Sequence, residues 1–215
     1  MITLYLVRHG ETVGNLEDRI QGHEDSPLSE LGVGQVQAIA DRLAQESFAA
    51  IYSSDLGRAR ATAEAVASRH DLPVQTTDLL REAYFGLVQG LTAEEFAQRY
   101  PAEFRKWRED SVANRPPEAE RVESVVQRCG AFLEHVEKKH KDGERVLAAV
   151  HAGSLRGVIC AACNLPVTCY TRIRSANASL SIVELGDRPA LCLLNDTCHL
   201  RSSGISDPGQ ETADL

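Results

Sequence analysis

The segment ITLYLVRHGET, residues 2–12, is the part of the chain that decides the fold. Its first half, Ile2 to Val7, is an apolar run rich in branched side chains, which is typical of a buried strand. An arginine, a histidine and a glycine follow directly at positions 8–10. In α/β proteins, ligands bind beyond the carboxyl ends of the strands. The segment therefore predicts a buried strand that delivers polar side chains to a binding site.

The same combination of strand and polar residue recurs later in the chain. Residues 145–150 form another apolar run, and His151 follows it. Residues 48–52 predict a further strand, and Arg58 lies in the first turn of the helix expected after it. Because parallel strands place their carboxyl ends at one edge of a sheet, we expect His9, Arg58 and His151 to converge there.

The remaining pattern alternates helices with strands. Helices are predicted over residues 31–43, 56–70, 94–107 with a break at Pro101, 122–136 and 153–163, and strands over 74–76, 178–185 and 190–194. Ser29 is the expected N-cap of the first helix, and the polar run 53–55 is expected to cap the second. This alternation predicts an α/β fold with a mainly parallel sheet, organised as a single domain over residues 1–200. Residues 201–215 are polar and are predicted to form a disordered tail.

Charge and composition exclude several classes of protein. The 215 residues carry a formal net charge of −8, which argues against nucleic-acid binding but allows a local cluster of arginines to bind a small anion. No apolar run approaches the ~18–20 residues of a membrane span. Residues 1–5 lack the basic region of a secretory signal, so we expect a cytoplasmic protein without a membrane partner.

The six cysteines all lie in the second half of the chain, at positions 129, 160, 163, 169, 192 and 198. Without a secretory signal they are expected to be reduced thiols in or near the core. The Cys160-x-x-Cys163 pair could indicate zinc, but a zinc site needs four ligands at suitable spacing and only Cys169 lies close by. We therefore predict no metal.

Several motifs occur in a fixed order. Arg8-His9-Gly10-Glu11-Thr12 is followed by Asn15, Gln21-Gly22, Ser53-Ser54-Asp55-Leu56-Gly57-Arg58-Ala59, Leu80-Arg81-Glu82 and Val150-His151-Ala152-Gly153. This ordered set resembles the histidine phosphatase superfamily, also called the phosphoglycerate mutase-like family, over most of the chain. The resemblance implies a three-layer α/β/α fold with a mainly parallel central sheet.

The resemblance also implies a role for the motif residues in phosphoryl transfer. His9 would be the nucleophile, with a neutral imidazole whose other nitrogen donates to a carbonyl near residue 10. Arg8, Arg58 and His151 would surround the phosphoryl oxygens, where fixed cations stabilise the transition state without a metal. No cofactor is expected.

A carboxylate and several binding residues complete the implied site. Glu82 would protonate the leaving oxygen and then activate the water that hydrolyses phosphohistidine. Further phosphate-binding residues would be Asn15, Gln21, Gly22 and Ala152. The loop around His23 is close enough in sequence to these residues to cover a substrate. Glu11, Glu94 and Glu95 are expected to be solvated instead.

The predicted activity is that of a histidine acid-type phosphatase, a hydrolase that acts on small phosphorylated metabolites through a phosphohistidine. The compact segment between Glu82 and His151, with its proline-containing loop at 113–124, resembles the phosphatase branch of the family. A cofactor-dependent phosphoglycerate mutase, whose insertion there is longer, is the alternative.

A non-catalytic module that binds a phosphorylated ligand is less favoured. Such modules typically lose the nucleophile or an arginine, whereas this chain keeps all five positions of the motif set. Phosphoglycerates, sugar phosphates, nucleotide-derived esters and phosphoproteins all fit as substrates, and a homodimer is left open.

Overall fold

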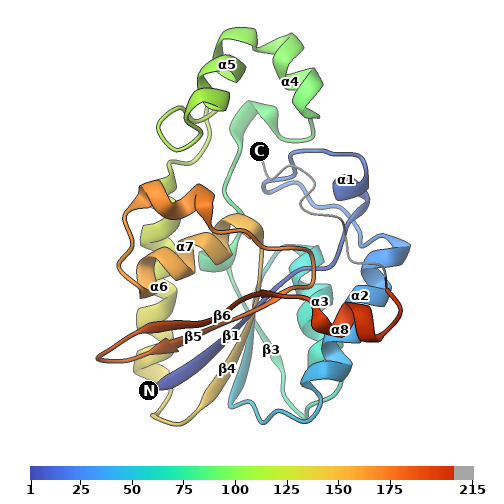
Figure 1. Ribbon diagram of the computed structural model, residues 1–215, viewed down its shortest axis with the longest axis vertical. Coiled ribbons are helices and arrows are strands. Elements are labelled where there is room, and N and C mark those ends of the chain that lie inside the picture. The colour runs from blue at the N-terminus through green and yellow to red at the C-terminus, as the bar shows by residue number, and fades with distance from the viewer. Residues whose placement is uncertain (206–215) are drawn as a thin grey trace.

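A six-stranded sheet forms the centre of the computed structural model, which describes residues 1–205 (Figure 1). Its strands are β1 (Ile2–Arg8), β2 (Ala50–Ser54), β3 (Val74–Thr77), β4 (Arg145–Val150), β5 (Leu180–Leu185) and β6 (Ala190–Asp196). The strand order is β3-β2-β4-β1-β5-β6. The first four strands run parallel to one another, whereas β5 is antiparallel to both β1 and β6. The predicted, mainly parallel sheet is confirmed.

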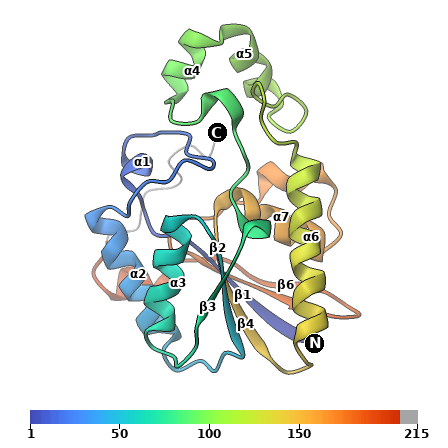
Figure 2. The same cartoon turned by 180° about the vertical axis from the view of Figure 1, so that it is seen from behind.

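Helices cover both faces of this sheet (Figures 1 and 2). The helices are α1 (Val13–Leu16), α2 (Glu30–Leu43), α3 (Gly57–Ala67), α4 (Ala93–Arg99), α5 (Pro101–Glu109), α6 (Val122–Lys139), α7 (Ala152–Ala162) and α8 (Cys198–Ser202). Residues of α2, α3 and α8 share one hydrophobic cluster with the sheet, and residues of α6 and α7 share another. The predicted three-layer α/β/α fold is therefore confirmed.

Strand β1 shows why the two clusters form on opposite faces. Leu4 and Leu6 belong to the cluster with α6 and α7, whereas Tyr5 and Val7 belong to the cluster with α2 and α3. Successive side chains of a strand point to opposite faces, and here helices cover both. A continuous apolar run is the pattern that such a strand requires, which is the pattern of residues 2–7.

A small helical unit lies beyond the carboxyl edge of the sheet. It consists of α4 and α5, and the predicted break between them is confirmed, because Pro101 is the first residue of α5. Phe96 and Trp107 are fully buried in a third cluster that also includes Ile20 and Leu91. The unit therefore has its own apolar packing and borders the site described below.

The segment between β1 and α2 contains the short helix α1. One local prediction near it is wrong. Helix α3 is not capped by the polar run 53–55. Instead, the backbone N–H groups of Gly57 and Arg58 donate to the carboxylate of Asp25, at 2.7 and 3.3 Å. The cap comes from a distant loop, so no local sequence signal marks it.

The start of the tail that was predicted to be disordered from Arg201 is structured instead. Arg201 lies within α8, and Ile205 packs against the cluster beneath α2, so the prediction of disorder is wrong for residues 201–205. Residues 206–215 lie outside the described part of the chain. Between residues 1 and 205, no helix is long and apolar enough to cross a membrane.

Two glycines of α2 differ in what surrounds them. A β-carbon on Gly32 would lie 1.9 Å from the backbone oxygen of Glu11, so this glycine allows α2 to approach the loop after β1. A β-carbon on Gly34 would meet nothing closer than 3.7 Å. We expect Gly34→Ala to raise the free energy of unfolding by up to ~1 kcal/mol, because alanine is the better helix former.

The matched substitution Gly32→Ala is expected to lower the free energy of unfolding by about 1–3 kcal/mol through overpacking. Urea unfolding followed by circular dichroism measures both values. An unchanged free energy of unfolding for Gly32→Ala would contradict the close approach of α2 to the loop after β1.

Candidate active site

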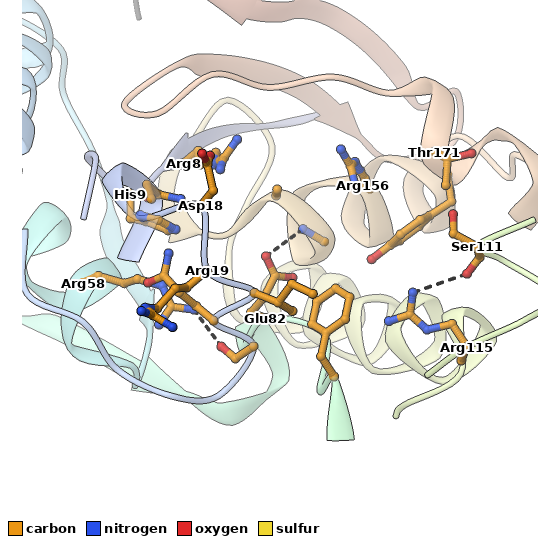
Figure 3. A pocket seen from close by; sticks show the side chains of 18 residues that line it. Arg8, His9, Asp18, Arg19, Arg58, Glu82, Ser111, Arg115, Arg156 and Thr171 are labelled. Atoms are coloured by element: carbon orange, nitrogen blue, oxygen red, sulfur yellow. Dashed lines mark hydrogen bonds between the residues drawn. The ribbon is translucent and has the colours of Figure 1, made fainter. Parts of the chain in front are cut away.

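A pocket opens at the carboxyl ends of the parallel strands, between the strand ends and the segments that flank α4 and α5 (Figure 3). All predicted site residues except His151 line it, namely Arg8, His9, Asn15, Gln21, Gly22, Arg58, Glu82 and Ala152. They come from segments far apart in the sequence. His9, Arg58 and His151 therefore meet at one edge of the sheet, as predicted.

His9 and His151 lie next to each other because β1 and β4 are neighbours. Arg8 pairs with Val150 in register, and the backbone N–H of His9 donates to the Val150 oxygen at 2.9 Å. The two imidazole rings are 5.1 Å apart between centroids. His151 is completely buried and is not among the residues that line the pocket.

The protonation state of His9 follows from its contacts. Nδ1 lies 2.7 Å from the backbone oxygen of Gly10, and a carbonyl can only accept, so Nδ1 carries the proton and Nε2 carries the lone pair. The predicted hydrogen bond is confirmed. Burial, and then the charges of Arg58 and Arg8, hold the pKa of His9 well below its usual value. His9 thus presents a neutral nitrogen with a free lone pair.

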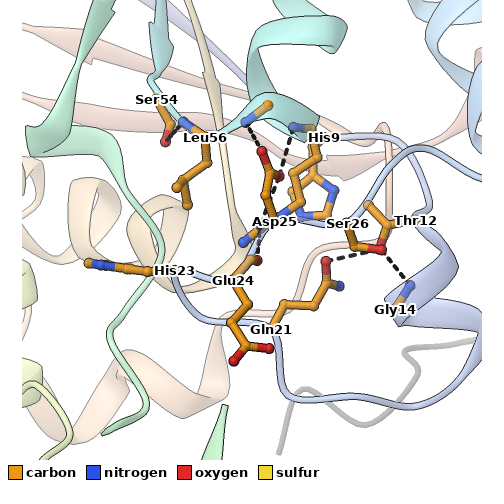
Figure 4. A network of polar contacts seen from close by, with 12 residues as sticks. His9, Thr12, Gly14, Gln21, His23, Glu24, Asp25, Ser26, Ser54 and Leu56 are labelled. Carbon is orange, nitrogen blue, oxygen red and sulfur yellow. Dashed lines mark hydrogen bonds and ion pairs between the residues drawn. The ribbon is translucent and has the colours of Figure 1, made fainter. Parts of the chain in front are cut away.

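Arg58 is held by the loop that contains residues 21–25. Its Nη2 donates to the backbone oxygen of Gly22 at 2.7 Å, and Nη1 donates to the oxygen of Glu24 at 2.9 Å. Asp25 lies 3.6 Å from Nη1 (Figure 4). Within residues 1–205, Nε of this buried arginine has no hydrogen-bond partner. The guanidinium is therefore fixed in place while its Nε–H remains without a partner in the described part of the chain.

Glu82 is held at both its carboxylate and its backbone. Oε1 accepts from the N–H of Ala83 at 2.7 Å, and Oε2 accepts from the N–H of Gly153 at 3.1 Å (Figure 3). Its backbone oxygen accepts from His23 Nε2 at 2.8 Å and from Arg128 Nη2 at 3.1 Å. The His23 loop therefore reaches the site, as predicted, but His23 itself positions Glu82 and is not part of the pocket lining.

A polar network holds the loop after β1 (Figure 4). Asn15 Oδ1 accepts from the backbone N–H of Thr12 at 3.1 Å and from Asn177 Nδ2 at 3.3 Å. Asn177 Nδ2 also donates to the backbone oxygen of His9 at 3.1 Å, and the Thr12 hydroxyl donates to Gln21 Oε1 at 3.0 Å. These bonds fix the direction in which His9 leaves the strand.

Sequence reasoning missed one whole side of the pocket. Ser111, Arg115 and Arg156 lie opposite His9 (Figure 3), and Tyr170 also lines the pocket. No local pattern marks Tyr170, which lies in the 3₁₀ helix Val167–Arg172, and Arg115 is marked only by the prolines that follow it.

The prediction that Glu11 is solvated is wrong. Its carboxylate is buried and accepts from the Ser29 hydroxyl at 2.7 Å. That hydroxyl also accepts from the Gly32 N–H, so it caps α2 as predicted.

The cysteines are free thiols. Cys129 and Cys160 are buried as expected, whereas Cys192 and Cys198 are exposed, which corrects the expectation that all lie in or near the core. In the part of the chain that is described, no three histidine, cysteine or acidic side chains gather in a way that could hold a metal ion.

The chain is similar in sequence to a known protein family. Residues 4–197 match the family model of the histidine phosphatase superfamily (branch 1). The chain is 35% identical to phosphoserine phosphatase 1 of Hydrogenobacter thermophilus over 201 residues, which cover 93% of this chain and 95% of that protein. It is 32% identical to phosphoglycerate mutase-like protein 4 of Arabidopsis thaliana over 219 residues, which cover 96% and 90%.

A solved structure agrees with this placement. That of Bacillus stearothermophilus YhfR superimposes with a TM-score of 0.85 at 32% identity and covers 93% of this chain and 100% of that one. The sequence motifs, the arrangement of His9 beside His151 and the family match agree, and the chain belongs to the histidine phosphatase superfamily, branch 1.

Proposed function

We propose that this protein is a phosphatase that hydrolyses small phosphomonoesters through a phosphohistidine formed on His9. One observation carries the proposal. The lone pair of a neutral, buried imidazole faces a pocket whose lining includes Arg8, Arg58 and the carboxylate of Glu82. Neutral imidazole is a nucleophile, and phosphate is the anion that such a cluster of arginines suits.

In the first step, the phosphoryl group would lie between Arg8 and Arg58, in line with His9 Nε2. A bond forms from Nε2 to phosphorus as the bond from phosphorus to the ester oxygen breaks. The arginines stabilise the charge on the phosphoryl oxygens, and they are already held in place by backbone carbonyls, so little reorganisation is required. His151, fully buried beside His9, would limit where the transferred group can sit.

Glu82 would supply the proton that the leaving oxygen takes up. In the second step a water molecule attacks phosphorus, the bond from phosphorus to His9 breaks, and Glu82 recovers a proton from the water. The position of the carboxylate on the pocket wall, fixed by Gly153 and Ala83, supports this role. No step needs a metal ion, so hydrolysis is expected to persist in EDTA.

The mutase-like relative makes transfer to a bound phosphoglycerate the second candidate. Both reactions pass through the same phosphohistidine and differ in the acceptor. The two are separated by comparing phosphate release with the interconversion of phosphoglycerates in the presence of 2,3-bisphosphoglycerate. Faster interconversion than release would favour the mutase.

Replacement of Glu82 by glutamine separates its role from that of His9. Glu82→Gln is expected to slow hydrolysis of alkyl phosphates by about 10²–10⁴-fold, because their leaving oxygen needs a proton. The transfer step with nitrophenyl phosphate is expected to change much less, because phenolate leaves unprotonated. Rapid-quench kinetics under non-acidic conditions measure both. Equal slowing of both transfer steps would remove Glu82 from the acid role, and the exposed Glu94→Gln is the matched control.

Replacement of Arg58 by lysine tests its hydrogen bonds rather than its charge. Lysine cannot satisfy both the Gly22 and Glu24 oxygens and still face the phosphate. We expect Arg58→Lys to lower kcat/KM by about 10²-fold or more, the range for removal of one positioned donor. Arg60→Lys changes an exposed residue of the same helix and serves as the control. Normal kinetics for Arg58→Lys would place this residue outside phosphate binding.

The pH dependence of His9 follows from its lowered pKa. Because burial and two arginines hold this pKa well below the ordinary histidine value of 6.5, the imidazole of the free enzyme stays neutral as pH falls through that value. It becomes protonated only at more acidic pH. Nitrogen NMR of the imidazoles, with His9→Ala for assignment, should report the neutral Nδ1–H form still dominant at a pH equal to the ordinary histidine pKa of about 6.5. Titration near the ordinary value would contradict the buried, neutral nucleophile.

A further inference from the structure

The backbone of His9 is held on both sides of the residue, and only one side belongs to the strand ladder. Its N–H donates to the Val150 oxygen of β4. Its backbone oxygen accepts two hydrogen bonds, from the N–H of Ala178 at 3.0 Å and from Asn177 Nδ2 at 3.1 Å. A carbonyl oxygen has two lone pairs, so these two bonds satisfy it. The turn that contains Ala178 therefore fixes the peptide that leads from His9 to Gly10.

This turn comprises residues 175–179 and also holds Arg8. The N–H of Ser179 donates to the backbone oxygen of Ala176 at 3.2 Å, which closes the turn. Nη1 of Arg8 donates to the backbone oxygen of Ser175. The 175–179 turn thus contacts both of the residues that the proposed reaction uses at the end of β1.

The conformation of the 175–179 turn requires support from its surroundings. Ala178 has a φ of +54°, in the left-handed region that a residue with a β-carbon rarely adopts. A backbone in such a conformation persists only where surrounding contacts hold it there. The positions of Arg8 and His9 therefore depend on what holds this turn.

Side chains of β6 and α8 hold the turn. Asn195, near the end of β6, accepts from the N–H of Ala176 at 2.6 Å through Oδ1. His199, in α8, places Nε2 3.0 Å from the backbone oxygen of Ala178. That oxygen can only accept, so Nε2 carries the proton and donates. His199 thus bonds the same residue whose N–H bonds His9.

His199 is itself fixed in the tautomer that this contact requires. Its Nδ1 lies 3.1 Å from Arg42 Nη1, and arginine can only donate, so Nδ1 accepts. Arg42 comes from α2, beside which α8 lies in Figure 1, and it also pairs with Asp196. The residue is only 5% exposed. Burial, and then the charge of Arg42, lower the pKa of His199 to about 4, so the ring is neutral and Nε2 stays a single donor at neutral pH.

We infer that His199, aided by Asn195, is a positioning residue for phosphoryl transfer, because it holds the backbone oxygen of His9 through the 175–179 turn. Two hydrogen bonds form the connection, from His199 to the Ala178 oxygen and from the Ala178 N–H to His9. His9 Nε2 must point in line with the bond that breaks, and the rate of such a step falls steeply when the nucleophile is displaced. This inference rests on the proposed function, since it assumes that His9 receives the phosphoryl group.

A positioning role has a kinetic signature of its own. His199 does not line the pocket, so its loss removes no contact to the substrate. Arg58 is held by the loop at residues 21–25 and not by this turn. Binding of the phosphate should therefore change less than the rate of transfer to His9. A fall in the amount of folded protein would instead lower the amplitude of phosphohistidine formation and leave its rate constant unchanged.

The test compares two substitutions of His199 that are similar in length. Glutamine can place an N–H near the position of Nε2, whereas methionine has no donor, and both give up the bond from Arg42. Rapid-quench measurement of phosphohistidine formation from nitrophenyl phosphate gives the rate constant and the amplitude. We expect His199→Met to lower the rate constant by about 10- to 100-fold, since a displacement of roughly 1 Å costs up to about 100-fold. His199→Gln should restore most of it.

NMR supplies a readout at His9 itself. The Nδ1 proton of His9 faces the Gly10 oxygen, which belongs to the segment that the turn holds. Its resonance should be protected from exchange with water in the wild type and in His199→Gln. In His199→Met we expect faster exchange, because the backbone that carries the acceptor is no longer held.

A second histidine provides the matched control. His140 is also buried, with Tyr52 at 3.0 Å and Glu144 at 2.8 Å, but it lies before the start of β4, at the opposite end of that strand from the pocket. His140→Met should leave the rate constant of transfer unchanged. Asn195→Gly removes the other side chain that holds the turn and tolerates the φ of +56° at this position, so it should lower the rate constant.

Three results would overturn the inference. The first is an unchanged rate constant in His199→Met, or in His199→Phe, which also lacks the donor, if the methionine variant does not fold. The second is a loss that His199→Gln does not restore. The third is an unchanged rate constant in Asn195→Gly, because the turn would then keep its place without these side chains.

The proposed function fails by a different result. Wild-type protein that forms no phosphohistidine from nitrophenyl phosphate would not be the proposed phosphatase, whatever the NMR spectrum shows. Wild-type protein that forms phosphohistidine at a rate that His199→Met matches would keep the proposed function and lose only the positioning role of His199.

Discussion

The parallel pairing of β1 with β4 is the constraint on which the site depends. Because Arg8 pairs with Val150 in register, the two chains leave the sheet side by side, and the hydrogen bond from His9 to the Val150 oxygen extends the ladder past the strand end. A strand advances about 3.3 Å per residue, so a slip of two residues would separate the imidazoles by more than the width of a phosphate. The apolar residues buried on both faces of the two strands hold this register.

The loop at residues 21–25 positions the other groups of the site. It receives the guanidinium of Arg58 on its backbone oxygens, caps α3 through Asp25 and holds the backbone of Glu82 through His23. One loop therefore sets the positions of both a phosphate-binding cation and the candidate acid. A change in this loop would alter charge and proton transfer together, although none of its side chains is required to react.

Burial gives the pocket its chemistry. It holds the pKa of His9 low enough for a neutral nucleophile, while arginine keeps its charge because its ordinary pKa is so high. The same burial leaves donors on Arg58, Arg115 and Tyr170 without partners in the described part of the chain. Unsatisfied donors reduce stability, and they are retained where a ligand can satisfy them.

The sequence by itself determined the elements and the residues that meet at the sheet edge. Local patterns mark the apolar runs at 2–7 and 145–150 and the helix at 122–136. They also place His9 and His151 directly after strands and Arg58 in the first turn of the helix after another strand. A parallel sheet brings such strand ends together. Only the tertiary structure decided what those residues touch. Contacts between segments distant in sequence decide four features: the cap of α3 by Asp25, the burial of Glu11, the helix at Arg201, and the pocket lining by Arg115 and Tyr170. Such contacts leave no periodic signal in the sequence of either segment.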